Sequence, residues 1–318
     1  MERLITVFLL LMVFLLPGCG EPEPAGHFTI ATLKGPSSMG MIRLIDSLSS
    51  DRHAAVQVKI LNEPLQVRKM MIDGTAHFAV LPSTMAAITY NKGMDYRLVA
   101  VPVWGTLYLV GQDTAVTEWE NLKGKRVYVM ARGMTPDVLF RHLLRKNGLD
   151  PDRDLLLDYS FPTHIDLAQA VNAGQAELAV ISEPLATLAI RNNPALRRLF
   201  SLNDEWNLVE GIPIAETAFM ARSEVLKNQP GMVSKLLDSY AASTEWVNSH
   251  PDSAAALIVR YGILPDSVAA LHAIPQINLK FARAGAVEEE VREYFDVFYR
   301  MNPDIIGRKM PDENFIYR

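Results

Sequence analysis

A segment that occurs twice along the chain constrains the fold most. Residues 74–86 read GTAHFAVLPSTMA and residues 174–186 read GQAELAVISEPLA, which are identical at five of thirteen positions without a gap. Each is preceded by a shorter turn of similar form, KGPS at 34–37 and RGMT at 132–135. The glycine of the turn precedes the glycine of the longer segment by 39 residues in the first half and by 41 in the second. Two matches in the same order and at nearly equal spacing indicate an internal duplication.

Strand-like and helix-like segments alternate along both halves, a pattern typical of α/β proteins. In each half an expected strand (Phe28–Leu33 and Val127–Ala131) leads through the glycine turn into an expected helix (Met39–Leu48 and Asp137–Lys146). Apolar periodicity and a helix-starting proline predict further helices nearer the C-terminus, over Gly231–Asn248, Pro251–Tyr261 and Val287–Arg300.

Each half ends in an extended segment that we expect to cross to the other half, 97–110 and 208–221. Pro102 and Pro213 interrupt these segments, which favours an edge or hinge over a central strand. The chain is then expected to run from one lobe to the other and back. Lobe one would comprise 27–108 plus 215–318, and lobe two 109–214. The predicted fold is α/β, with two pseudo-repeated lobes joined by two crossover segments.

The N-terminus predicts export and lipidation. The apolar run Leu4–Leu16 is too short to span a membrane but has the length of a signal-peptide core. It leads into Leu16-Pro17-Gly18-Cys19, which resembles the bacterial lipobox and contains the only cysteine of the chain. We therefore expect a signal peptide over 1–18, lipidation at Cys19 and a flexible tether over 19–26. The alternative is a cytosolic protein with a buried N-terminal helix.

Composition argues against several classes of protein. One cysteine excludes an internal disulfide, a Cys-based zinc site and an iron–sulfur cluster, and the seven histidines never fall three to five residues apart. A formal charge of −5 with no run of Lys and Arg disfavours nucleic acid as a partner. Neither a nucleophile elbow nor a P-loop nor a dinucleotide fingerprint is present. We expect no cofactor, no metal and no enzymatic activity.

The whole organisation resembles the substrate-binding proteins of ABC importers, with the periplasmic-binding-protein fold of type II. The resemblance is closest to the branch that binds nitrate, sulfonates, taurine and thiamine pyrimidines. It is carried by ATLKGPSSMGMIRLID at 31–46, the unit 74–84, NLKGKRV at 121–127, SEP at 182–184 and the tail 306–315. The resemblance implies a monomeric lipoprotein on the periplasmic or outer side of a cell membrane. It would capture a small polar or anionic organic solute between its lobes and deliver it to an ABC permease.

The ligand is expected where strands end and helices begin, because helix N-termini present free backbone N–H groups at the carboxyl edge of such sheets. Four turns qualify, at 35–39, 82–85, 133–137 and 182–184. The residues expected to bind the ligand, including two from the first crossover, are Ser37, Ser38, Met39, Ser83, Thr84, Trp104, Thr106, Met134, Thr135 and Glu183.

Each of these residues also has a purely structural interpretation. The hydroxyl side chains could act only as helix caps, and Trp104 could be a core aromatic. Glu183 could stabilise a helix start, or it could face the ligand and favour one with an amine or a ring N–H.

Two other functions use the same fold. One is an enzyme of the menaquinone- or thiamine-pathway type, and the other is a ligand-sensing subunit of a membrane receptor. The lipobox favours transport over the enzyme, because such enzymes act on cytosolic intermediates. Neither the identity nor the charge of the ligand follows from the sequence.

Replacing the cysteine tests the anchoring prediction. Cys19→Ala should move the protein from the membrane fraction to the soluble fraction of its host, because the acyl chains can attach only to that thiol. Immunoblotting of fractionated cells measures the distribution. An unchanged membrane fraction would contradict the lipoprotein prediction.

Overall fold

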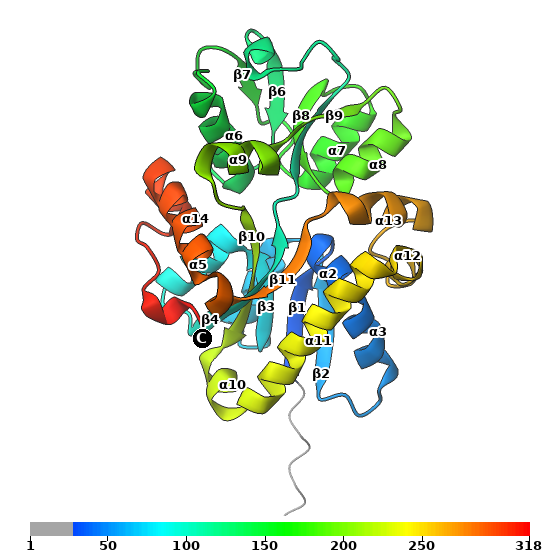
Figure 1. The fold of residues 1–318 in the computed structure, drawn as a ribbon, viewed down its shortest axis with the longest axis vertical. Helices are drawn as coiled ribbons and strands as arrows, with labels where there is room; N and C mark the ends of the chain where they lie inside the picture. Colours follow the sequence, from blue (N-terminus) through cyan, green and yellow to red (C-terminus); the bar gives the residue numbers. More distant parts are fainter. Residues whose placement is uncertain (1–27) are drawn as a thin grey trace, which may run out of the picture.

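The computed structural model describes residues 28–318, so the expected signal peptide, Cys19 and the whole tether lie outside the described residues. The chain forms two β-sheets, each covered by its own helices, in two lobes (Figure 1). The first sheet has six strands in the order β11-β4-β10-β3-β1-β2: Leu279–Arg283, Tyr96–Trp104, Ala215–Arg222, Phe78–Pro82, Phe28–Leu33 and Val56–Leu61. The second has five in the order β7-β6-β8-β5-β9: Leu156–Asp158, Arg126–Val129, Leu178–Ser182, Leu107–Gly111 and Arg197–Ser201.

The helices connect the strands of both sheets. In the first lobe these are α2 (Pro36–Gly40), α3 (Ile42–Ser50), α4 (Pro64–Ile72), α5 (Ser83–Asn91), α10 (Ser223–Asn228), α11 (Pro230–Ser249), α12 (Pro251–Arg260), α13 (Ser267–Ala273) and α14 (Glu288–Met301). In the second lobe they are α6 (Thr135–Lys146), α7 (His164–Asn172), α8 (Leu185–Asn192) and α9 (Leu202–Glu210). Short 3₁₀ turns are η2 (Trp119–Leu122), η3 (Ile274–Gln276), η4 (Ala284–Val287), η5 (Pro303–Ile306) and η6 (Glu313–Phe315). Within residues 28–318, no helix is both long and apolar enough to span a bilayer.

The two sheets repeat one topology, which confirms the α/β prediction. β1 pairs in parallel with β2 and β3, and β6 pairs in parallel with β7 and β8. A fourth strand then joins antiparallel, β10 beside β3 in one sheet and β5 beside β8 in the other. Each of these antiparallel strands follows a segment of the opposite lobe, so each lobe is completed by chain that arrives from the other.

The first crossover is very short. β4 ends at Trp104 in one sheet and β5 begins at Leu107 in the other, which leaves only Gly105 and Thr106 between them. The return passes through α9 and enters β10 at Ala215.

The prediction for Pro102 was wrong. This residue lies in β4, which is flanked by β11 on one side and β10 on the other and is therefore a central strand. Register shifts on both sides of β4, between Leu279 and Ala282 and between Thr217 and Phe219, interrupt the ladder next to it. A bulged ladder tolerates a residue without an N–H, which is the physical reason that a proline fits here.

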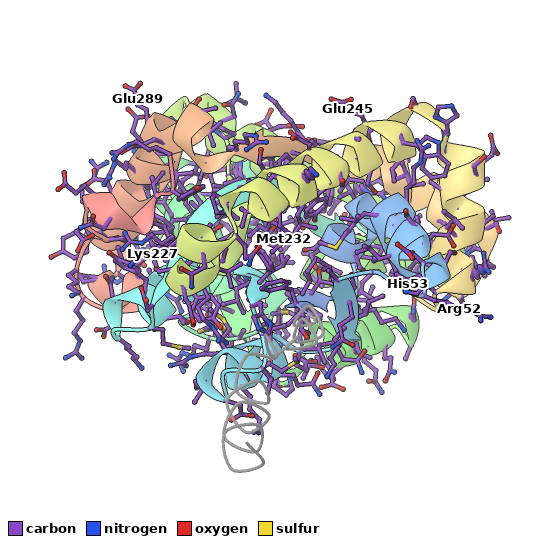
Figure 2. The ribbon with its side chains drawn as sticks, turned by 90° about the horizontal axis from the view of Figure 1, so that it is seen from below. Arg52, His53, Lys227, Met232, Glu245 and Glu289 are labelled. Carbon is purple, nitrogen blue, oxygen red and sulfur yellow. The ribbon has the colours of Figure 1, made fainter. Side chains whose placement is uncertain are left out.

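Other boundaries differ by small amounts. The helix expected over 39–48 is divided at Met41 into α2 and α3, and the first residues of the expected crossover 208–221 still belong to α9. The long amphipathic helix predicted over 231–248 is α11, which crosses one side of the first lobe from Met232 near its start to Glu245 near its end (Figure 2).

One apolar core is continuous between the lobes. It contains Leu98 of β4 and Leu109 of β5. It also contains the side chains of α9 and α14 that pack against each other. Trp206 of α9 is fully buried with its ring centroid 5.5 Å from that of Phe298 and 6.0 Å from that of Tyr294. Figure 1 shows α9 directly above α14, on one side of the molecule. Aromatic rings pack against one another at this contact, although the indole N–H of Trp206 and the hydroxyl of Tyr294 are buried there without a hydrogen-bond partner among residues 28–318.

Gly105 has no substitute at the crossover. Its φ of 61° lies in the left-handed region, and a Cβ built there would lie 2.8 Å from the Cβ of Asn203 on α9. A side chain at this position would therefore incur backbone strain and also push α9 away from the crossover.

Gly105→Ala should destabilise the protein more than Gly148→Ala. Gly148 has a similar φ of 78°, but its added Cβ would meet nothing within 4 Å. Both variants incur about 1–2 kcal/mol of backbone strain, and only the first must also displace Asn203. We expect the melting temperature of Gly105→Ala to lie at least about 2–4 °C below that of Gly148→Ala, as measured by differential scanning calorimetry. Equal melting temperatures would contradict a close contact between Gly105 and Asn203 of α9.

Candidate ligand-binding site between the two lobes

The turn after β1 is closed by its own hydrogen bonds. The hydroxyl of Ser38 donates to the carbonyl of Gly35 (3.0 Å) and accepts from its N–H (3.1 Å), and the carbonyl of Ser37 accepts from the hydroxyl of Tyr240 (2.9 Å). Met39 is fully buried in the apolar core of the first lobe. The structure thus gives Ser38 and Met39 structural contacts, and the ligand contacts expected of Ser37, Ser38 and Met39 stay predictions.

The start of α5 meets the start of α6 across the two lobes. The Oγ1 atoms of Thr84 and Thr135 lie 2.7 Å apart, so one of these hydroxyls donates to the other. Next to Thr84, the Oγ of Ser83 is buried and has no hydrogen-bond partner among the described residues. Two of the turns expected to face one another therefore do so.

Two further hydroxyls at this edge were missed by the sequence analysis. Thr32, near the end of β1, and Thr217, near the start of β10, are buried, and neither Oγ1 atom is hydrogen-bonded within residues 28–318. A buried hydroxyl without a partner costs about 1–3 kcal/mol. Thr32 lies two residues before Lys34, where the first glycine turn begins, and that position was the available signal. Thr217 could not be placed, because its neighbourhood depends on the return crossover.

The first crossover is held by a carboxylate that the sequence analysis also missed. Glu216 on β10 accepts the backbone N–H of Thr106 (2.6 Å) and its hydroxyl (2.7 Å). Burial raises the pKa of Glu216 above its ordinary value, and the bonds from Thr106 partly oppose that shift. On its other side, the carbonyl of Thr106 accepts the N–H of Glu183 (2.9 Å). Thr106 thus connects the two lobes rather than projecting freely between them.

Trp104 belongs to the same region but lies within packed side chains. It is 6% exposed, and its indole N–H donates to the carbonyl of Lys280 on β11 (2.8 Å). These contacts agree with the core-aromatic interpretation of Trp104, and its stacking on a ligand stays a prediction.

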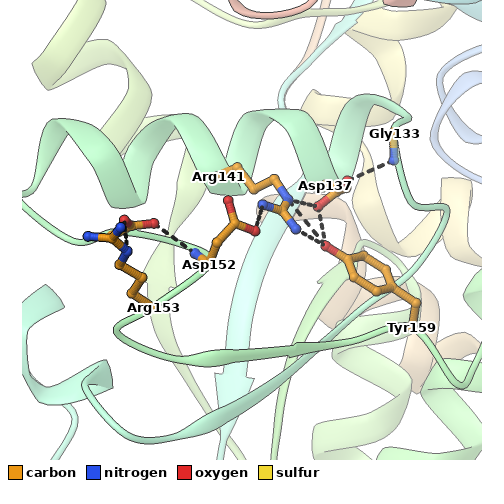
Figure 3. A network of polar contacts seen from close by, with 7 residues as sticks. Gly133, Asp137, Arg141, Asp152, Arg153 and Tyr159 are labelled. Carbon is orange, nitrogen blue, oxygen red and sulfur yellow. Dashed lines mark hydrogen bonds and ion pairs between the residues drawn. The ribbon is translucent and has the colours of Figure 1, made fainter.

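The N-terminus of α6 is covered by its own carboxylate (Figure 3). Asp137 accepts the N–H of Gly133 through one oxygen (2.7 Å). Its other oxygen accepts from Arg141 (2.9 Å) and from the hydroxyl of Tyr159 (2.6 Å). Met134, at the N-cap of this helix, is 37% exposed. The turn therefore presents an apolar side chain, while its charged group is neutralised inside the lobe.

Glu183 is buried and paired. Arg198 donates to its Oε1 through Nε (2.9 Å) and Nη2 (2.5 Å), and the N–H of Thr187 in the first turn of α8 donates to Oε2 (3.1 Å). Burial raises the pKa of this carboxyl, and the charge of Arg198 opposes the rise. Both carboxylate oxygens have partners, so the geometry favours the structural role among the two considered for Glu183.

His164 opens α7 beside the end of β8 and is a candidate that the sequence analysis did not select. Its Nδ1 lies 3.1 Å from the hydroxyl of Ser182, the last residue of β8. Burial lowers the pKa of His164 to about 4, so the imidazole is neutral at pH 7. No spacing in the sequence connects residues 164 and 182, which explains the omission.

The site thus combines hydroxyls, backbone donors and neutralised carboxylates. Across residues 28–318, no group of three or more His, Cys, Asp or Glu side chains is placed to hold a metal ion. Of the residues described above, Thr84 and Thr135 meet across the two lobes. The others lie near strand ends or helix starts of their own lobe, which are Thr32, Ser83 and Thr217 in the first and Met134, His164 and Ser182 in the second.

Comparison with known proteins identifies the family. The model of a family described as "ABC transporter, phosphonate, periplasmic substrate-binding protein" matches residues 36–245, more than half of the chain. The chain belongs to this family. The expected resemblance to ABC-importer binding proteins is therefore confirmed.

Solved structures agree with the fold. An ABC transporter protein from Parabacteroides distasonis superposes with a TM-score of 0.78 at 27% identity, covering 92% of this chain and 98% of that one. The periplasmic aliphatic sulphonate binding protein SsuA from Escherichia coli gives a TM-score of 0.72 at 16% identity, covering 92% of each chain. The binding protein YtlA of Bacillus subtilis, so named only provisionally, is 26% identical over 149 residues. That match spans 46% of this chain and less than half, 42%, of the relative.

The buried imidazole predicts a pH dependence. An unfolded histidine binds a proton near pH 6.5, whereas His164 in the folded protein does so only near pH 4. The free energy of unfolding should therefore fall by about 1–3 kcal/mol as the pH drops from 6.5 to 4, since the unfolded state binds the extra proton.

In His164→Gln this part of the pH dependence should disappear from urea denaturation curves measured across that range. His53→Gln, at an exposed position, is the control and should keep the slope of the parent. A parent-like slope in His164→Gln would show that its imidazole does not carry the effect.

Proposed function

We propose that this protein binds a small organic anion between its two lobes and delivers it to an ABC import permease without chemical conversion. The observation that carries this proposal is the set of buried hydroxyls without partners at the facing edge of the first lobe. A polar ligand would supply the missing hydrogen bonds, and neutral hydroxyls can hold an anion without reacting with it.

Family membership supports the same ligand class. The family description names phosphonate, and the Escherichia coli neighbour is named for aliphatic sulphonates. Both are organic molecules with a tetrahedral oxyanion head. The proposal that this chain binds a phosphonate or a sulfonate rests on the hydroxyls described above.

Contacts between the lobes support a closing motion. In addition to the contact of Thr84 with Thr135, the hydroxyl of Tyr108 donates to the carbonyl of Gln276 (2.9 Å), and Arg191 pairs with Asp266 (3.0 Å). These contacts lie between polar groups that water can solvate when the lobes part. The α9–α14 contact, in contrast, is formed mainly by aromatic rings. We infer that the lobes open on the polar side and stay packed at this aromatic contact.

The cellular setting is part of the proposal. We propose that lobe one comprises 27–108 plus 215–318 and lobe two 109–214, and that the ten residues predicted from the sequence contribute to the ligand site. We also propose that lipid on Cys19 holds a monomer at a cell membrane, facing the periplasm or the cell exterior. The enzyme and the sensing subunit remain the alternatives. Recovery of the bound ligand unchanged would argue against the enzyme, whereas the neighbouring genes would separate transport from sensing.

Titration with defined ligands tests this function. The mature protein should bind at least one of ethanesulfonate, ethylphosphonate and their 2-amino derivatives in isothermal titration calorimetry. Small-angle scattering should then give a smaller radius of gyration with the saturating ligand, because the lobes close on it. Mass spectrometry should recover that ligand unchanged. No binding to any of the four would contradict the proposed ligand class, and a converted ligand would favour the enzyme.

A further inference from the structure

Two polar atoms lack a partner where α9 of the second lobe packs on α14 of the first. They are the indole Nε1 of Trp206 and the hydroxyl oxygen of Tyr294, and both side chains are fully buried. The two ring centroids lie 6.0 Å apart. Neither atom is hydrogen-bonded within residues 28–318, so this arrangement of the lobes leaves one buried donor of each lobe unsatisfied, which is unfavourable for both.

Comparable side chains inside a single lobe do have partners. In the first lobe the hydroxyl of Tyr96 donates to the carbonyl of Ala76, and in the second the indole N–H of Trp119 donates to the carboxylate of Glu205 (2.8 Å). The missing partners are therefore a property of the contact between the lobes. Unsatisfied donors at such a contact are expected where the two bodies also take a second arrangement.

An acceptor for Tyr294 lies on a strand that its helix covers. α14 packs on β10, and Glu216 is the second residue of that strand. Burial and the negative charge of Glu216 both raise the pKa of Tyr294 well above its ordinary value, so the carboxylate lies close to this phenol and the phenol keeps its proton. In the arrangement described here, both oxygens of Glu216 accept from Thr106 instead.

The bonds from Thr106 to Glu216 join the two sheets. We expect Thr106 to move with the second sheet, because it directly precedes β5 and its carbonyl accepts the N–H of Glu183, the residue that follows β8. Glu216 and Tyr294 belong to the first lobe. A bond from Tyr294 to Glu216 would therefore lie within one lobe, whereas the bonds from Thr106 depend on how the lobes are placed.

We propose that Tyr294 is a positioning residue that sets the balance between two arrangements of the lobes, by exchanging with Thr106 for the carboxylate of Glu216. When the second lobe turns about the α9–α14 contact, Thr106 leaves Glu216 and the hydroxyl of Tyr294 donates to the carboxylate in its place. Water between the parted lobes solvates the groups that Thr106 withdraws. The inference rests on the proposed function, because it assumes the motion that opens the ligand site.

The exchange gives the ligand-free protein a preference. The open arrangement provides Tyr294 with an acceptor, and the arrangement described here does not. A ligand held between the lobes has to offset the loss of that bond, so Tyr294 lowers the apparent affinity and keeps the empty protein open.

Tyr294→Phe tests this exchange. The variant loses a hydroxyl that is unsatisfied in the arrangement described here and bonded in the open one, so the balance should shift toward the former. Small-angle scattering of the ligand-free variant should give a smaller radius of gyration than that of the ligand-free parent. Isothermal titration calorimetry with ethanesulfonate, ethylphosphonate or their 2-amino derivatives should show an apparent Kd about tenfold lower, because more of the protein is ready to bind.

Tyr96→Phe is the matched control. Tyr96 is also a buried tyrosine of the first lobe, but it opens β4 at the end far from the crossover, and its hydroxyl already has the carbonyl of Ala76 as a partner. Its loss should lower the free energy of unfolding and leave the radius of gyration and the affinity unchanged. The same result for Tyr294→Phe would reduce Tyr294 to a structural role and overturn the inference.

Glu216→Ala identifies the acceptor. Without this carboxylate Tyr294 has no partner in either arrangement, so adding Tyr294→Phe to Glu216→Ala should change neither the scattering nor the Kd. A decrease in Kd as large as in the parent background would show that Glu216 is not the partner.

The outcomes separate this inference from the proposed function. If the parent binds a probe and Tyr294→Phe has the scattering and the Kd of the parent, the exchange is wrong while the proposed function stands. If the parent binds none of the four probes but ligand-free Tyr294→Phe is still the more compact protein, the proposed ligand class fails and the exchange stands. Without binding and without compaction, both fail.

Discussion

A single carboxylate joins the two segments that pass between the lobes. Glu216, at the start of the return strand, accepts both the N–H and the hydroxyl of Thr106 in the outgoing crossover. The outgoing crossover contains only two residues, so it has little freedom of its own. Since the carbonyl of Thr106 also accepts the N–H of Glu183, a displacement of β10 reaches the start of α8 through two hydrogen-bonded steps. The relative placement of the lobes, and with it the shape of the site, depends on this connection.

Buried polar groups in this protein fall into two kinds with different energetic consequences. The carboxylates of Asp137 and Glu183 are fully provided with donors, and removing one partner of such a buried ion pair typically costs about 3–5 kcal/mol. The hydroxyls of Thr32, Ser83 and Thr217 have no partner among residues 28–318, so they lower the stability of the ligand-free protein. The second kind is expected where a protein retains binding capacity at the expense of stability.

The sequence predicted the fold better than the site. The duplicated segment located β3 with α5 and β8 with α8, because both the period and the glycine turns are local features. Pro102 was misplaced because a bulge depends on the neighbouring strands, which the sequence does not show. Serine and threonine near strand ends could be selected as candidates, but whether a hydroxyl is already bonded depends on distant partners. Ser38 bonds within its own turn, Thr84 bonds to the other lobe, and Ser83 is left without a partner.

The polar rim formed by α8 and α13 makes this chain suitable as an optical reporter. Residues 28–318 contain no cysteine, so a thiol introduced there would be the one thiol in this part of the chain to react with a label. Asp266 precedes α13 and pairs with Arg191 of the opposite lobe, on the side where we propose that the lobes open. A fluorophore attached next to this ion pair, rather than in place of Asp266, would pass from a confined to a hydrated environment in the opening motion that we propose. The ion pair between the two lobes thereby indicates where a concentration sensor could be built.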